Sequence, residues 1–209
     1  MSLKNKRILI TAGPTWVSID EVRVISNIST GETGILLAEE ALRQGAKVTL
    51  FLGPVSACCL PRPIRLVRFA FFHELKDRIK KELESGRYEL VIHSAAVSDF
   101  KPVRGERGKL SSGRRLRLEL EPLPKIIDYI KQSAPRAKIV IFKLEAGVAD
   151  ATLISRALLA RNKYKAEVVI ANQLNPYRAF IIDKKDGIIK VKSKRELVKR
   201  LFQTLGKIG

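Results

Sequence analysis

A chain of 209 residues, 45% of them hydrophobic, is long enough to bury one substantial core and too apolar to be intrinsically disordered. It has no apolar run of the roughly 18 residues that cross a bilayer, and its basic N-terminus lacks the apolar stretch of a secretory signal. Forty Lys and Arg against 21 Asp and Glu give a net charge of +19, which favours anionic ligands. The only cysteines, Cys58 and Cys59, are neighbours and a poor disulfide pair, so a reducing cytoplasm is expected.

The first half of the chain alternates between short apolar runs and amphipathic segments. Apolar runs predict buried strands at residues 7–11, 47–52, 65–69 and 89–94. Apolar residues at helical spacing predict helices at residues 31–44 and 74–83, and Gly45 is a typical helix stop. This order of elements is that of a doubly wound sheet.

The second half adds elements of a different kind. Helices are expected at residues 122–131, 150–160 and 194–205, and buried strands at 138–144 and 167–171. Leucines alternating with charged residues predict a half-exposed antiparallel strand at 116–121, and Asp186-Gly187 predicts a turn between strands at 179–183 and 188–192. We therefore expect an α/β protein: a Rossmann-like, doubly wound, mostly parallel sheet with helices on both faces and an added antiparallel portion. Residues 1–209 are expected to form a single domain.

The link between the first strand and the first helix is unusual. It is far longer than the about 2–6 residues that normally join these elements, and loops of that length usually carry function. It holds a Gly13-Pro14 turn and ends in the run S-T-G-x-x-G. Small residues at a helix N-terminus form an anion site. Neither the dinucleotide fingerprint nor the phosphate-loop motif is present, so the pattern indicates a non-standard phosphate loop.

Polar residues follow several of the predicted strands. Asn27, Asp99, Glu145 and Asn172 each lie shortly after a strand or at its end. Ligands of open α/β sheets bind outside the carboxyl ends of the strands. One polar residue in such a place is usually a helix cap, but four at one edge beside an anion loop favour a binding site.

A polar loop over residues 101–114 carries Arg107 and Lys109 among several glycines. The loop is either ordinary basic surface or a cationic flap that closes over a polyphosphate. His73 and His93 have no catalytic partner in the sequence and are expected to be structural. The motifs of common hydrolases and zinc peptidases are absent.

At these residues the chain resembles the phosphopantothenate–cysteine ligase family, also called phosphopantothenoylcysteine synthetase. The family's first loop is matched by I-T-A-G-P-T at 10–15, I-D at 19–20, V-R at 22–23, I-S-N at 25–27 and S-T-G at 29–31. Later motifs match at A-A-V-S-D-F (95–100), K-L-S-S-G (109–113), P-K-I-I (124–127), F-K-L-E (142–145) and V-I-A-N (169–172). They occur in family order over nearly the whole chain, which makes the resemblance specific.

The resemblance implies a two-step reaction of coenzyme A biosynthesis. The carboxylate of 4′-phosphopantothenate attacks the α-phosphate of a nucleoside triphosphate, which gives an acyl-nucleotide and pyrophosphate. The amine of L-cysteine then attacks the acyl carbon, which gives an amide and a nucleoside monophosphate. Such chemistry needs positioned backbone N–H groups, Mg²⁺ and a few cations rather than an enzyme nucleophile.

The resemblance also implies roles for single residues. Four small residues would hold the triphosphate: Gly13, Ser29, Gly31 and Gly34. Two would contact the base or ribose: Phe142 and Asn172. Four would bind phosphopantothenate and the acyl intermediate: Asn27, which is also catalytic, Ala95, Ala96 and Asp99. Lys109 would be the flap lysine of the activation step, and Arg23 would reach the substrate of the other subunit in a homodimer. The metal ligands stay unassigned.

Departures from the family pattern leave some points open. Typical bacterial members use CTP and carry F-A-A-E-T where this chain has F-K-L-E-A, and eukaryotic members use ATP, so the base is undecided. The chain begins at the ligase strand, so we expect no flavin and, as a possible partner, a separate phosphopantothenoylcysteine decarboxylase. Two alternatives remain: an NAD(P)-dependent short-chain reductase, favoured by fold alone, and a nucleic-acid-binding module, favoured by charge alone. We expect neither a membrane nor a specific nucleic acid as partner.

Overall fold

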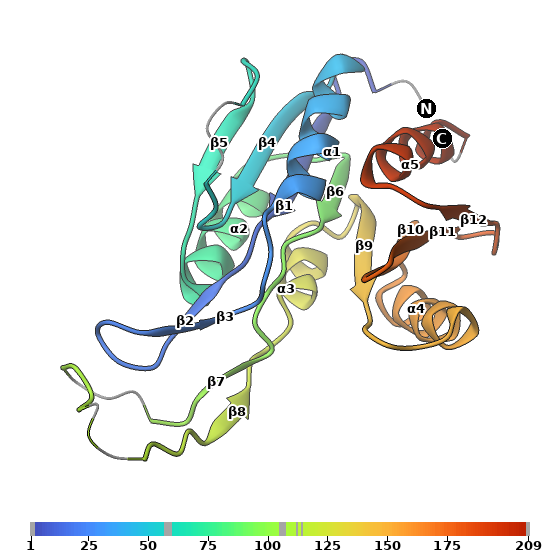
Figure 1. The fold of residues 1–209 in the computed structure, drawn as a ribbon. Helices are drawn as coiled ribbons and strands as arrows, with labels where there is room; N and C mark the ends of the chain where they lie inside the picture. The colour runs from blue at the N-terminus through green and yellow to red at the C-terminus, as the bar shows by residue number, and fades with distance from the viewer. Residues whose placement is uncertain (1–2, 57–59, 105–107, 112, 114, 208–209) are drawn as a thin grey trace.

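The computed structural model describes residues 3–56, 60–104, 108–111, 113 and 115–207 (Figure 1). Its centre is an eight-stranded sheet in the order β12-β11-β10-β9-β6-β1-β4-β5. The strands are β1 (Arg7–Ala12), β4 (Lys47–Leu52), β5 (Arg65–Arg68), β6 (Leu90–His93), β9 (Lys138–Leu144), β10 (Val168–Leu174), β11 (Tyr177–Asp183) and β12 (Ile188–Val191). The first six are parallel, and β11 and β12 pair antiparallel. The predicted fold class is confirmed.

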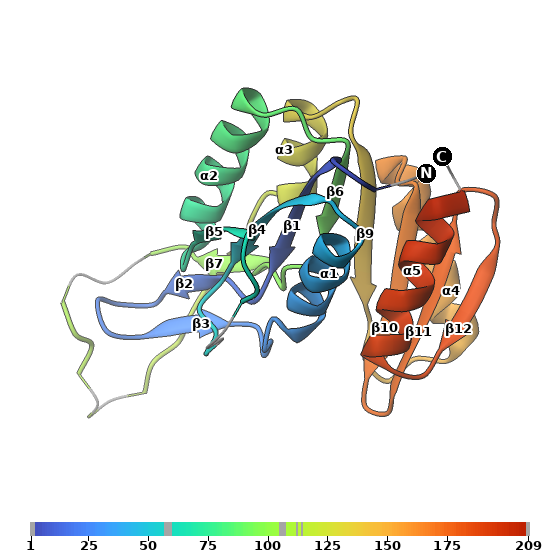
Figure 2. The ribbon, with the colours of Figure 1, turned by 90° about the horizontal axis from the view of Figure 1, so that it is seen from above.

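Helices cover both faces of this sheet (Figure 2). One face carries α1 (Glu32–Arg43) and α5 (Lys194–Lys207), and the other carries α2 (Phe72–Ser85), α3 (Ile126–Ser133) and α4 (Asp150–Tyr164). Because strand side chains alternate between faces, β1 sends Ile8 and Ile10 toward α1 and Leu9 toward α2. The apolar runs are buried on both sides, as strands of parallel sheets are. None of the described helices is both long and apolar enough to cross a bilayer.

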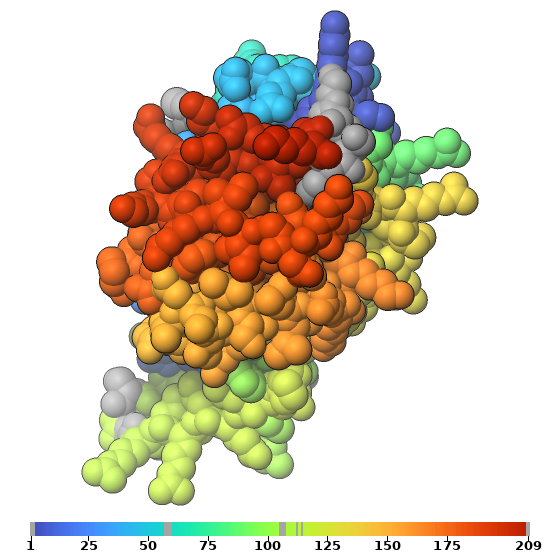
Figure 3. Space-filling model, turned by 90° about the vertical axis from the view of Figure 1, so that its right-hand side faces the viewer, coloured from blue at the N-terminus to red at the C-terminus, as the bar shows by residue number. Residues whose placement is uncertain are grey.

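Two hairpins extend beyond the carboxyl ends of the parallel strands (Figure 1). The first arm pairs β2 (Trp16–Ser18) with β3 (Val24–Ser26). The second arm pairs β7 (Phe100–Pro102) with β8 (Leu120–Pro122). The strands β2 and β7 contact each other, so the arms lie side by side. Figure 3, which faces the β12 edge, shows side chains of the second arm projecting below α4.

The arms account for most differences from the expected elements. The first arm lies inside the long loop, where no strand was predicted. The prediction of a strand at 116–121 was largely wrong, because only residues 120–122 pair; Leu116, Leu118 and Leu120 are all exposed, since no sheet lies beneath them. The helix predicted from residue 122 begins at Ile126, because Pro122 is still part of β8. Cys58, Cys59 and Arg107 lie outside the described residues.

Candidate active site

The strand order reverses between β1 and β6, and the chain segments that leave these strands stay bonded to each other. Backbone N–H groups of Ser94 and Ala96 donate to the carbonyls of Thr11 (3.2 Å) and Gly13 (2.9 Å), and the Thr15 N–H donates to the Ala96 carbonyl (3.3 Å). Dinucleotides in such sheets occupy the crevice that opens at this reversal. Here the crevice is closed by continued pairing, so a ligand at this edge must lie over the linked loops.

His93, the last residue of β6, contacts the end of β1 through the Thr11 side chain. The Thr11 hydroxyl lies 2.8 Å from Nδ1 of His93, and its oxygen accepts a hydrogen bond from the Ala95 N–H (3.2 Å). The Thr11 hydroxyl thus links His93 on β6 to the backbone of the loop that follows it. Burial lowers the pKa of His93 to about 4, so the ring is neutral near pH 7. The contact agrees with the structural role expected for His93.

Two glycines meet at the start of α1. Gly31 is the N-cap residue and has φ 72°, and Gly13 has φ 79°. Both are in the left-handed region that favours glycine. A Cβ on Gly31 would lie 3.5 Å from the Gly13 Cα, so the two predicted phosphate-loop segments do come together. The N-cap glycine has no side chain to cap α1, and the hydroxyls of Ser29 and Thr30 make only long contacts of 3.4 Å with the N–H groups of Gly31 and Glu32. The positive end of a 12-residue helix thus faces this loop.

Gly34 is buried where α1 crosses β1. A Cβ built on Gly34 would lie 2.3 Å from the Ala12 Cβ and 3.0 Å from the Ser94 Oγ. Real Cβ atoms do not approach that closely, so glycine is required for α1 to lie this near the strand. Gly34 therefore sets the position of the helix N-terminus, and its contact with the triphosphate stays a prediction.

Phe142 and Asn172 lie on the α1 face of the neighbouring strands β9 and β10. Phe142 packs against the core on that face. The Asn172 Oδ1 is buried and has no hydrogen-bond partner among the described residues. An unpaired buried carbonyl costs about 1–3 kcal/mol, so this oxygen is suited to a ligand donor. The two residues predicted to contact the nucleotide are thus near each other.

Tyr177 and Lys194 belong to the same face but were not predicted as site residues. Tyr177 packs on the core beside α1, and burial together with the charge of Glu32 raises its pKa to about 12. The Lys194 Nζ lies 2.5 Å from a carboxylate oxygen of Glu32 and joins the start of α5 to the first turn of α1. The only sequence signal for Tyr177 is its place two residues before the buried Ala179 of β11.

Asn27 is bonded to the loop after β6. Its Nδ2 donates to the carbonyls of Ala96 (3.2 Å) and Val97 (2.9 Å), which leaves Oδ1 without a protein partner among the described residues. The N–H groups of Ala95 and Ala96 are already bonded, to the Thr11 hydroxyl and the Gly13 carbonyl. These two alanines are therefore held in place rather than free as donors.

Carboxylates at this edge have nearby cations. Asp99 and Lys125 form an exposed ion pair with an N–O distance of 2.5 Å, and Lys125 was not predicted. Glu145 pairs with Lys143 (3.0 Å) and Arg156 (2.6 Å), and the Lys143 hydrogen bond is the main reason that its pKa is lowered. The Glu145 N–H donates to the Asn172 carbonyl (3.0 Å), so these two residues do meet as expected.

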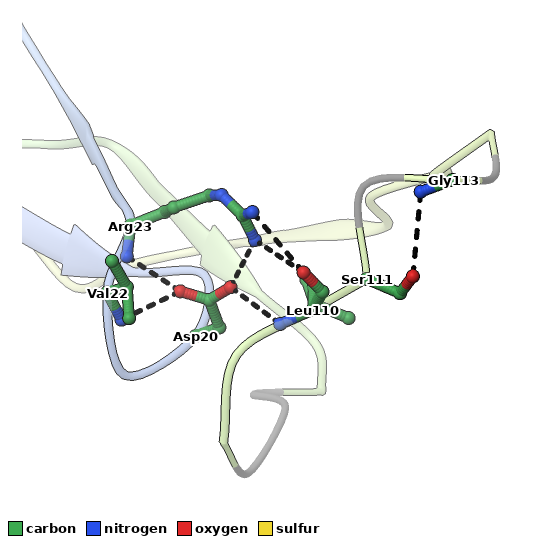
Figure 4. A network of polar contacts seen from close by, with 6 residues as sticks. All are labelled: Asp20, Val22, Arg23, Leu110, Ser111 and Gly113. Carbon is green, nitrogen blue, oxygen red and sulfur yellow. Dashed lines mark hydrogen bonds and ion pairs between the residues drawn. The ribbon is translucent and has the colours of Figure 1, made fainter.

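Lys109 lies on the second arm, is exposed, and has no carboxylate partner among the described residues. Its neighbours contact the first arm (Figure 4). The Arg23 guanidinium contacts Asp20 (2.5 Å) and the Leu110 carbonyl (3.2 and 3.3 Å) of its own chain. Reach across a dimer interface stays a prediction for Arg23. A role for Asp20 was missed because Asp20 and Leu110 are 90 residues apart in sequence.

No group of three or more His, Cys, Asp or Glu side chains in the described part of the chain is placed to hold a metal ion. Mg²⁺ usually keeps several waters and enters such sites on substrate phosphates with one or two carboxylates, and does not need a protein cage. The donors at this edge are compatible with that mode, since the exposed Asp99 carboxylate lies on the loop that Asn27 contacts.

Comparison with known proteins identifies the family. Residues 3–205 match the family described as the DNA/pantothenate metabolism flavoprotein C-terminal domain. The chain belongs to this family. The resemblance drawn from the motifs is thereby confirmed at the level of the family.

Relatives and solved structures agree with this assignment. The coenzyme A biosynthesis bifunctional protein CoaBC of Thermococcus kodakarensis is 36% identical over 213 residues, which is 99% of this chain and 52% of that protein. The CoaBC protein of Methanocaldococcus jannaschii is 32% identical over 98% of this chain and 51% of its own length. The chain thus spans about half the length of these relatives.

A crystal structure of the DNA/pantothenate metabolism flavoprotein from Streptococcus pneumoniae superimposes with a TM-score of 0.86. It is 27% identical and covers 98% of this chain and 100% of the other. A Cab2 mutant in complex with phosphopantothenate-cysteine has a TM-score of 0.80 at 20% identity and covers 98% of this chain and 88% of its own. At that identity the likeness concerns the fold.

Proposed function

We propose that this chain is a ligase of coenzyme A biosynthesis that joins 4′-phosphopantothenate and L-cysteine through an acyl-nucleotide. The carboxylate attacks the α-phosphate of CTP or ATP and pyrophosphate leaves; the cysteine amine then displaces the nucleoside monophosphate. The family supports the substrate class, because relatives are named for coenzyme A biosynthesis. The site supports the reaction type, because it has the N-terminus of α1 and nearby cations, and because the Thr11 hydroxyl that contacts His93 is fully buried and cannot reach a substrate.

The strongest support for this proposal is the buried Asn172 Oδ1, which has no hydrogen-bond partner in the described part of the chain. It lies on the face of the sheet that also bears the N-terminus of α1. A nucleotide bound there would give this oxygen a hydroxyl or amino donor from its ribose or base. Its phosphates would meet the Gly13–Gly31 contact at the positive end of α1. Phe142 beside Asn172 offers an aromatic ring to the base.

The remaining residues fit the two chemical steps. The Asn27 side chain contacts the loop that carries Ala95 and Ala96, and its Oδ1, which no described residue contacts, would face the acyl group. The exposed Lys109 would stabilise the charge that develops at the α-phosphate. Mg²⁺ would enter with the triphosphate, with the exposed Asp99 as a candidate carboxylate.

The native assembly proposed for this ligase is a homodimer in the cytoplasm. Large apolar side chains are exposed on and near the arms: Val22, Ile28, Phe100, Leu116, Leu118 and Leu120. Ile28 beside the catalytic Asn27 is 97% exposed. Apolar side chains gathered in one region favour a protein interface. A separate decarboxylase that takes the amide product is a further proposed partner, and flavin is not required by either step.

The reductase alternative is disfavoured by the closed crevice between β1 and β6, where a dinucleotide would have to lie. The nucleic-acid alternative rests on net charge alone. Both are tested by thermal unfolding with NADPH and with duplex DNA, in parallel with CTP or ATP plus Mg²⁺. Stabilisation by the triphosphates alone supports the ligase.

The direct test is product formation. The chain, Mg²⁺, phosphopantothenate, cysteine and either CTP or ATP should yield the amide by mass spectrometry, and the more effective triphosphate identifies the base. Lys109→Gln should slow pyrophosphate release by about 10²-fold, the scale of losing one oriented charge-stabilising donor. Lys101→Gln is the matched control, because Lys101 lies on the same arm and pairs with Glu121. Absence of amide with both triphosphates would contradict the proposal.

A further inference from the structure

A buried carboxylate, that of Asp20, links the two arms, and its contacts with Arg23 and Leu110 form a clasp between them. The side chain of Asp20, at the turn of the first arm, is fully buried and accepts four hydrogen bonds (Figure 4). Its Oδ1 accepts the N–H groups of Val22 (2.8 Å) and Arg23 (2.6 Å). Its Oδ2 accepts the Arg23 guanidinium (2.5 Å) and the N–H of Leu110 on the second arm (3.1 Å).

Further contacts complete the clasp on both sides of Lys109. The Arg23 guanidinium donates to the Leu110 carbonyl (3.2 and 3.3 Å). The Glu21 N–H donates to the Gly108 carbonyl (3.3 Å). The residue before Lys109 and the residue after it are therefore both bonded to the turn of the first arm, while the Lys109 side chain stays exposed.

The charge state of Asp20 keeps the clasp closed near neutral pH. Burial on its own would raise the pKa of this carboxyl. The hydrogen bonds from Leu110, Val22 and Arg23, together with the Arg23 charge, outweigh burial and lower the pKa to about 2. Asp20 is thus an ionised acceptor at every pH at which the enzyme would work.

We propose that Asp20 is a positioning residue: through Arg23 and the Leu110 backbone it holds the second arm so that Lys109 is aimed at the phosphates. The inference rests on the proposed function, because Lys109 acts on a nucleotide only if the chain is the ligase. A flexible four-carbon side chain on an untethered arm would sample many positions, and its productive fraction would fall. The clasp fixes the Lys109 backbone and leaves only its rotamers free.

Asp20→Asn is the sharpest perturbation because it keeps the shape and removes acceptors. An ionised carboxylate offers acceptors on both oxygens, whereas an amide offers one oxygen and two N–H donors. Whichever way the amide turns, either the pair Val22 and Arg23 N–H or the pair Arg23 guanidinium and Leu110 N–H faces another donor. Glu21→Gln is the matched control, since it removes one carboxylate charge at the neighbouring position, where the exposed side chain is outside the clasp.

The first readout is amide hydrogen exchange of the segment that contains Leu110, measured by mass spectrometry without substrates. Asp20→Asn should speed its exchange about 10-fold or more relative to wild type and to Glu21→Gln, while the core strand β1 keeps its protection. An unchanged exchange rate of the Leu110 segment in Asp20→Asn would overturn the proposal that Asp20 holds the second arm. This result does not depend on the chemistry of the protein, so it separates failure of the clasp from failure of the proposed function.

The second readout separates the half-reactions. Asp20→Asn should slow pyrophosphate release about 10- to 100-fold, as a misplaced group does, and leave the reaction of pre-formed acyl-nucleotide with cysteine nearly unchanged. In the Lys109→Gln background the same substitution should cost less than about 3-fold, because it acts through Lys109. Equal losses in both half-reactions, or independent, additive losses in the double variant, would overturn the positioning role.

Discussion

Substitution of Gly34 by alanine tests whether the position of α1 is set by its close contact with β1. The added Cβ would lie 2.3 Å from the Ala12 Cβ, whereas ordinary carbon–carbon contacts are about 3.5–4.0 Å. The helix must therefore move outward by more than about 1 Å, because both atoms belong to short, rigid side chains.

The expected magnitude follows from two opposing effects. Overpacking of this kind costs about 1–3 kcal/mol, and the severity of the contact places Gly34→Ala at the upper end. The higher helix propensity of alanine stabilises the helix by about 1 kcal/mol, which offsets part of this cost. The net loss of about 2 kcal/mol should lower Tm by about 4–8 °C for a chain of this size.

Gly206→Ala is the control, since a Cβ there would meet none of the described residues within 4 Å. It should raise Tm by up to about 4 °C, as a gain of up to about 1 kcal/mol would. Thermal unfolding by circular dichroism measures both variants. In Gly34→Ala the shift of Gly31 away from Gly13 should also reduce the stabilisation by CTP or ATP with Mg²⁺. If Gly34→Ala were as stable as Gly206→Ala, the reasoning about helix position would be refuted.

Three further predictions concern the site. Asn27→Asp should let the acyl-nucleotide form but block its conversion, because a carboxylate beside the intermediate's phosphate adds like-charge repulsion; mass spectrometry of quenched reactions should show the intermediate accumulate, and normal turnover would sink the assignment. Mixing inactive Arg23→Ala with inactive Asn172→Ala protein should restore some activity if sites are shared between subunits, whereas no recovery after confirmed subunit exchange would indicate sites built from one chain. Burial lowers the pKa of His93 from 6.5 to about 4, so the unfolded chain binds a proton before the folded one does and stability should fall as pH drops from 6.5 toward 4. The free energy of unfolding of His93→Gln, measured in urea, should fall less over that pH range than that of the wild type. An equal fall in both proteins would contradict the lowered pKa of His93.

Much of the fold could be predicted because its strands and helices are strongly periodic. The bounds of β4 and β9 agree with the apolar runs that predicted them, and Leu75 and Ile79, which lie four residues apart in the predicted helix at 74–83, are buried in α2. An alternating pattern predicts a strand only if one of its faces is buried, so the prediction was wrong where neither face is covered. Leu116 and Leu118 alternate with charged residues as a half-buried strand would, yet both lie exposed on the second arm.

The site could be predicted only in part, for a related reason. Glycines and polar residues after strands point to the carboxyl edge, and Gly13 and Gly31 do meet there. Contacts between segments far apart in sequence leave no local pattern. The clasp of Asp20 on Leu110 and the closed crevice between β1 and β6 depend on how loops meet in space, so neither could be foreseen from spacing.

The central claim, that an acyl-nucleotide links the two substrates, is tested most directly by following one oxygen atom. Phosphopantothenate with an ¹⁸O-labelled carboxylate is incubated with the chain, Mg²⁺, cysteine and the more effective triphosphate. Because the carboxylate oxygen bonds to the α-phosphorus and stays there when the amine displaces the nucleotide, the nucleoside monophosphate should carry one ¹⁸O. Label in inorganic phosphate, with a nucleoside diphosphate as the other product, would show activation at the γ-phosphate and contradict the account.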